Sequence, residues 1–186
     1  MGGELRLTSA AAKSGASPGV GDWYREHLSF VCRSLERLGV PPAEIEDRAH
    51  DVFVIAHQRW SAFDPSNPVR PWLFGIAVKT ASGARQRAWR TREVAVDAYP
   101  DTPDGQQLPD ERAAQQQLRQ RLLRALETLD LDRRAIFVLH DLEGVAVPEA
   151  ARALGVPLNT AYTRLRAARL QVAEAFKRLT GPGGAR

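Results

Sequence analysis

Apolar residues recur at three- and four-residue steps along most of the chain, a spacing that predicts amphipathic helices. The first such stripe consists of Leu28, Val31, Leu35 and Leu38, and the glycine and two prolines that follow predict its end. Further helices are expected over residues 42–60, from about residue 71 to 90, and from 112 almost to the end of the chain. No stretch alternates with the period of two that a half-buried strand shows. We therefore expect an all-α fold.

The composition changes sharply in the middle of the chain. Residues 93–111 contain six acidic residues, three prolines and no lysine or arginine. An acidic, proline-rich stretch of this length is typical of an extended linker. The chain is therefore expected to form two small helical domains joined by a flexible acidic linker. The expected segments are a disordered leader (1–20), a first domain (21–92), the linker (93–111), a second domain (112–179) and a short tail (180–186).

The formal net charge of +4 fits a nucleic-acid partner but also many other proteins, so the position of the charges matters more than their sum. Cys32 is the single cysteine, which excludes an intrachain disulfide and a cysteine-based zinc cluster and favours a reducing compartment. The first residues lack the cationic start and apolar run of a signal peptide. No window approaches the ~18 consecutive apolar residues of a membrane span. We expect a cytoplasmic protein without membrane insertion.

Residues 146–172 have the pattern of a helix-turn-helix. Pro148 suits the first turn of a helix, and Gly155 suits a sharp corner, because glycine takes left-handed backbone angles at little cost. The helix after the corner gathers Ala161 and Leu165 on one face and polar side chains on the other. Amides, hydroxyls and guanidiniums match base edges and phosphates of a major groove. The candidate DNA-binding residues are Asn159, Thr160, Tyr162, Thr163, Arg164, Arg166 and Arg169. An ordinary hairpin with a solvated basic face is the alternative.

Three short motifs in and before this segment extend the pattern. They are "LHDLEG", "EAARALGV" and "TAYTRLRAAR". Together they resemble region 4 of bacterial sigma factors of the extracytoplasmic-function (ECF) type, which implies that the second helix reads the −35 promoter element. Ala146 and Pro157 stand where that family often has Ser or Thr, and Tyr162 stands where it often has a basic residue. The loss of a helix cap costs about 1 kcal/mol. We therefore expect an intact fold with an unusual base preference.

The predicted helix over residues 42–60 has an acidic, histidine-bearing face. With Val52 as the buried direction, that face carries Glu46, Asp47, His50, Asp51, Val54 and His57. Such a face indicates a docking surface for a basic partner helix. A solvated face is the alternative. A metal site built from Glu46, His50 and His57 is disfavoured, because no further ligands cluster with them, and no metal is expected.

The motifs "IEDRAHDVF" and "RPWLFGIA" resemble region 2 of the same sigma factors, with His50 in the place of a frequent glutamine. The resemblance implies that the acidic face docks on the clamp helices of the polymerase β′ subunit, while the second domain contacts the β flap. It also implies that Trp72, Leu73 and Ile76 belong to the core.

The loop before Trp72 and the helix after it would then capture the melted −10 strand. Basic and aromatic groups suit a flipped base and a single strand. The implied residues are Phe63, Ser66, Asn67, Val69, Lys79, Arg85, Arg87, Trp89 and Arg90. A solvated basic helix end is the alternative for the last four. Lys79 and Gly83 replace a frequent Asn and Asp, which leaves the preferred −10 base open.

Nothing in the sequence predicts catalysis. The four histidines are scattered without a nucleophile motif, and no glycine-rich phosphate-binding motif occurs. We expect no enzyme activity and no cofactor. The resemblance implies a sigma factor that binds core RNA polymerase and promoter DNA and is regulated by an anti-sigma factor. A standalone helix-turn-helix regulator and a protein-binding adaptor that sequesters an anti-sigma factor or polymerase are the alternatives.

Overall fold

A computed structural model describes the backbone of residues 20–90 and 109–180 and the side chains of residues 23–83 and 113–179. The predicted leader, linker and tail lie almost entirely outside these residues. The N-terminal half consists of α1 (Val20–Arg37), α2 (Ile45–Gln58) and α3 (Val69–Arg90), with 3₁₀ turns at Pro42–Glu44 and Trp60–Ala62. The C-terminal half consists of α4 (Pro109–Glu127), α5 (Leu131–Phe137), a π-helical turn (Val138–Leu142), α6 (Val147–Leu154) and α7 (Leu158–Thr180). The described residues contain no strand, and the all-α prediction is confirmed.

The N-terminal half packs three helices around one core. Val31 and Leu35 of α1 and Leu38, the residue after its end, are fully buried, as the apolar stripe predicts. Leu73 and Ile76 of α3 are buried with them. An aromatic cluster closes the end of this core, where its edge-to-face and tilted ring contacts add to the burial of apolar area. It joins Trp23, Phe53, Trp60, Phe63 and Trp72, with ring centroids 5.3 Å apart for Trp23–Trp60 and 4.6 Å apart for Phe63–Trp72.

The helix-turn-helix forms as its local signals predict. Pro148 lies in the first turn of α6, and Gly155 ends this helix with φ 66°, ψ 35°, in the left-handed region. The apolar face of α7 is buried, and its members are Ala161, Leu165, Ala168 and Val172. Three alanine or valine side chains let α7 approach α5 and α6 closely, which restricts the rotation of α7 about its axis.

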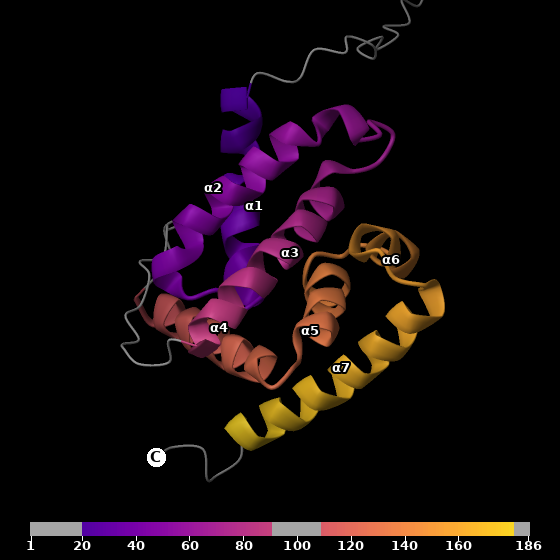
Figure 1. Cartoon of the computed structure of the whole chain (residues 1–186). Coiled ribbons are helices and arrows are strands. Elements are labelled where there is room, and N and C mark those ends of the chain that lie inside the picture. The colour runs from indigo at the N-terminus through magenta and orange to yellow at the C-terminus, as the bar shows by residue number, and fades with distance from the viewer. Residues whose placement is uncertain (1–19, 91–108, 181–186) are drawn as a thin grey trace, which may run out of the picture.

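The two halves pack directly against each other. Figure 1 shows α3 lying between the α1–α2 pair and the α5–α6 pair. The contact of α3 with α6 is a backbone approach: a Cβ atom on Gly75 would lie 2.4 Å from the carbonyl oxygen of Ala153. Only a glycine fits there without a shift of one helix.

Charged side chains form ion pairs across the same boundary between the two halves. Arg119 of α4 donates to both carboxylate oxygens of Glu36 at 2.8 and 2.9 Å, and Arg37 pairs with Glu143. Arg134 of α5 is 3% exposed and reaches under the turn after α1, where a Cβ on Gly39 would meet its Nη1 atom. Each contact joins residues that are far apart in sequence.

Helix α6 begins without a side-chain cap, and this can be tested. Ala146 occupies the N-cap with extended backbone angles, and Glu149 lies three residues on. Ala146→Ser would complete a Ser-x-x-Glu capping box. We expect the free energy of unfolding of the C-terminal half, measured by urea denaturation, to rise by about 1 kcal/mol. Ala146→Val is the control, because it adds bulk without an acceptor. Equal stability of the Ser and Val variants would contradict the assignment of the cap.

Candidate nucleic-acid interface

Helix α7 presents a polar strip opposite its buried face. The strip, defined by Asn159, Tyr162, Thr163 and Arg166, is exposed to solvent, and Thr160 lies half-buried beside it. The hydroxyl of Thr163 donates to the carbonyl of Asn159 at 2.9 Å, which leaves its oxygen free to accept. Among the described residues, Arg166 has no ion-pair or hydrogen-bond partner. The strip therefore offers donors and acceptors of several kinds along one line of the helix.

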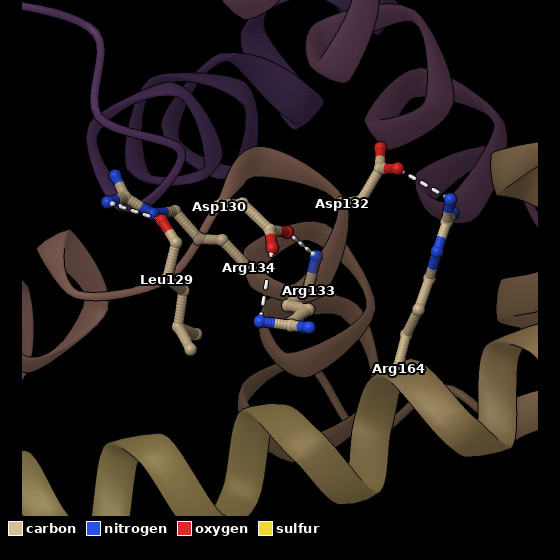
Figure 2. A network of polar contacts seen from close by, with 6 residues as sticks. All are labelled: Leu129, Asp130, Asp132, Arg133, Arg134 and Arg164. Carbon is tan, nitrogen blue, oxygen red and sulfur yellow. Dashed lines mark hydrogen bonds and ion pairs between the residues drawn. The ribbon is translucent and has the colours of Figure 1, made fainter.

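The remaining two predicted arginines flank the strip and are both paired. Arg164 donates to Asp132 of α5 at 2.5 Å, as Figure 2 shows. Arg169 donates to Asp141 of the π-helical turn through Nε at 2.9 Å and Nη2 at 2.5 Å. The hydrogen bond to Asp141 raises the pKa of Arg169 above its ordinary value. The sequence pattern does not identify Asp132 or Asp141 as partners of these arginines, because neither lies near α7 along the chain.

The acidic face predicted on α2 is formed by the helix as expected. Glu46, Asp47, His50 and His57 are exposed, and Val54 is 41% exposed among them. Asp51 is half-buried and accepts a hydrogen bond from Arg48 at 2.6 Å. The opposite face of α2 is buried in the core. Among the described residues, no three His, Cys, Asp or Glu side chains lie close enough to hold a metal ion.

The loop between Trp60 and α3 is organised by Asp64. Its carboxylate accepts from the backbone N–H of Ser66 at 3.0 Å, from the hydroxyl of Ser66 at 2.8 Å and from the amide of Asn67 at 3.0 Å. The backbone hydrogen bond from Ser66, followed by the one from its hydroxyl, holds the pKa of Asp64 below its ordinary value. Asp64 was not among the predicted residues. The Asp-Pro-Ser-Asn order is the signal that could have revealed it, because Asp side chains commonly accept from the backbone two residues on.

The structure brings only part of the predicted −10 set together. Phe63, Ser66, Asn67 and Val69 share the loop and the first residue of α3. Lys79 is exposed on α3, about 15 Å along the helix from Val69 at about 1.5 Å per residue. The other four lie in the last two turns of α3, with side chains outside the described set: Arg85, Arg87, Trp89 and Arg90.

The loop before α3 contacts the C-terminal half. Arg152 of α6 donates to the side-chain oxygen of Asn67 at 3.2 Å. The amide group of Asn67 is therefore shared between Asp64 of its own loop and Arg152 of the opposite half.

No described helix is long and apolar enough to cross a membrane.

Comparison with known proteins gives matches in both halves. Residues 23–91 match the family model of Sigma-70 region 2, and residues 119–172 match that of Sigma-70, region 4. The RNA polymerase sigma factor CnrH of Cupriavidus metallidurans is 30% identical over 174 residues, which cover 90% of this chain and 91% of that protein. The ECF RNA polymerase sigma-E factor of Escherichia coli is 27% identical over 144 residues, covering 73% of this chain and 75% of that protein.

Solved structures agree with these matches. CnrH in complex with the cytosolic domain of CnrY superposes with a TM-score of 0.60 and 26% identity, covering 83% of this chain and 85% of that one. The sigma factor RpoE in complex with the anti-sigma factor NepR, from Bartonella quintana, shares the fold with a TM-score of 0.61 at 22% identity, covering 84% and 97%. The chain belongs to the ECF-type sigma factors of bacterial RNA polymerase.

Proposed function

We propose that this sigma factor directs RNA polymerase to promoters through three surfaces: the strip of α7 on the −35 element, the loop before α3 on the −10 strand, and the exposed face of α2 on core polymerase. The observation that carries the proposal is the exposed polar strip of α7, which lies opposite a fully packed face and after a left-handed corner at Gly155. A helix held in this way presents its outer side chains to a major groove.

The surface of α2 suits a protein partner. Its acidic groups surround Val54, an apolar side chain that is 41% exposed. An apolar centre with a charged rim is the usual anatomy of a protein interface, and acidic rims favour basic partners. We assign this face to the β′ clamp helices and, by the family resemblance, the C-terminal half to the β flap.

Regulation by a protein partner follows from the relatives. RpoE is held by the anti-sigma factor NepR in its solved structure. We propose that this chain also has such a partner. Its proposed binding to core polymerase implies a location in the cytoplasm. We expect the protein to act without catalysis. Cys32 is its single thiol, and burial raises the pKa of that thiol, which disfavours the nucleophilic thiolate.

With its halves packed together, the protein cannot contact both promoter elements at once. Elements centred at −35 and −10 lie about 25 base pairs apart, which is about 85 Å of duplex at about 3.4 Å per base pair. A compact chain of this length has a radius of gyration of about 16 Å. The halves therefore separate when the protein occupies a promoter, and the contact of Arg152 with Asn67 breaks.

Run-off transcription with purified core polymerase on a promoter library tests the function. We expect initiation at a subset of promoters that share −35 and −10 sequences, and none with core polymerase alone. A standalone regulator would instead bind promoter fragments tightly without core polymerase. Failure to initiate at any promoter would overturn the proposal.

The α2 surface is tested by Asp47→Lys. The reversed charge faces a basic partner, so we expect the affinity for core polymerase, measured by fluorescence anisotropy, to fall by about tenfold, or about 1.4 kcal/mol. Glu26→Lys makes the same charge change on the exposed surface of α1, outside both assigned polymerase surfaces, and serves as the control. Equal losses in the two variants would show that net charge, rather than the α2 face, controls binding.

Separation of the halves is tested at Gly75. Gly75→Leu forces a side chain against the carbonyl oxygen of Ala153, while a residue other than glycine favours the helix itself by about 1 kcal/mol. We expect a larger radius of gyration of the free chain by small-angle X-ray scattering, with helical content retained. Arg133→Ala removes an ion pair within the α5 segment and is the control. An unchanged scattering profile for Gly75→Leu would contradict the packing of α3 on α6.

A further inference from the structure

The two paired arginines of α7 stand on opposite sides of the polar strip. At about 100° per residue, Arg164 lies about 140° to one side of Asn159 and Arg169 lies about 80° to the other. Their partners, Asp132 and Asp141, belong to the segment on which α7 packs. An ion pair on each side of a helix opposes its rotation in either direction.

The pair of Arg169 with Asp141 occupies the binding edge of the guanidinium. Its Nε and Nη2 atoms both donate to the carboxylate, which is the geometry that Arg also uses toward the O6 and N7 atoms of guanine. Arg169 would have to break both hydrogen bonds to read a base. The side chain of Asp141 is 22% exposed, so the acid is held more firmly than a fully solvated one.

The backbone around Asp141 is itself fixed. The π-helical turn is followed by Gly144 with φ 73°, and the Nδ1 atom of His140 lies 2.7 Å from the carbonyl oxygen of Val145. π-Helical turns are rare and occur frequently at functional sites. Here the turn places the Asp141 carboxylate toward α7.

The second pair is built on the first turn of α5. Asp130 caps this helix by accepting from the backbone N–H of Arg133 at 2.8 Å, and Asp132 follows in the first turn, where the helix dipole favours a negative charge. Figure 2 shows Asp132 reaching Arg164 from this position. The Arg164 side chain is 29% exposed.

Arg166 differs from both. It is exposed in the centre of the strip, and among the described residues it has no ion-pair partner. Its full set of donors is available for a bidentate contact with a guanine. The sequence pattern grouped Asn159, Arg164, Arg166 and Arg169 together. In the described part of the structure, Arg164 and Arg169 are each paired with an aspartate, whereas Arg166 is not.

We infer that Asp132 and Asp141 are positioning residues for promoter reading: they hold Arg164 and Arg169 away from base edges, fix the rotation of α7, and leave Asn159, Tyr162, Thr163 and Arg166 to specify the −35 sequence. This inference rests on the proposed binding of α7 to promoter DNA. Arg166 then determines specificity, whereas Arg164 and Arg169, which carry the same guanidinium group, do not.

The experiment uses the full chain with core polymerase and a promoter library randomised at the −35 element. Bound sequences are counted, and the salt dependence of binding is measured on one selected promoter. Arg166→Ala should flatten the base preference at one position by about 10- to 100-fold. Arg169→Ala should weaken binding to all sequences alike, because it loosens α7 without removing a reader.

Asp141→Asn supplies the readout that a merely structural role would not move. It releases Arg169 to the phosphates, so the slope of log K against log[salt] should become steeper by about 0.9, and binding to unrelated DNA should rise. Asp141→Glu keeps the charge and should restore the slope of the unaltered chain. Asp132→Asn makes the same test at Arg164, so the inference stays testable if one variant does not fold.

The outcomes separate the two proposals. If the unaltered chain enriches no sequence, the proposed function fails and the inference fails with it. If it enriches a −35 sequence but Arg169→Ala flattens the preference as Arg166→Ala does, only the inference is overturned. Folded Asp141→Asn and Asp132→Asn variants with unchanged slopes would overturn it as well.

Discussion

The apolar face of α7 has to be buried against α5 and α6, and this constraint determines which of its side chains are left for a ligand. Ala161 and Ala168 are fully buried and small, so the helices lie close together and α7 cannot turn without opening a cavity. The left-handed corner at Gly155 then sets the direction in which α7 leaves α6. Every exposed group of the polar strip takes its position from this packing.

The same principle operates on the N-terminal half. Helix α2 buries Val52 and Ala56 in the core, and its acidic face is what remains outside. The aromatic cluster around Trp23 holds the start of the loop before α3, because Phe63 of that loop and Trp60 just before it belong to the cluster. In each half, a packed core presents polar groups on its outer surface.

Local features of the fold could be predicted from the sequence, whereas contacts between the halves could not. The stripe ending at Leu38, the corner at Gly155 and the acidic face of α2 each arise from neighbours along the chain, and periodicity or a single glycine reveals them. Arg134 is a charged residue at 3% exposure, and no local rule predicts its burial under Gly39.

The candidate site divides in the same way. Which side chains of α7 share a face follows from helical geometry alone, but which arginines are already paired depends on Asp132 and Asp141, which reach α7 only through tertiary structure. The role of Asp64 is only partly predictable from the sequence. Its contacts are local, but its loop lacks the periodicity that would reveal them. The end of α3, with Arg85 and Trp89, lies outside the described side chains.

Asn67 gives the molecule a means of coupling its two halves. Its side-chain oxygen accepts from Arg152, so under the proposed function Arg152 and a −10 nucleotide compete for this oxygen, and separation of the halves favours the nucleotide. Linkage requires that the two effects be equal: whatever factor opening adds to the affinity for the −10 strand, the strand adds to the equilibrium constant for opening. If Asn67 binds the −10 strand as proposed, melted promoter DNA acts through this contact as an allosteric effector of the arrangement of the halves.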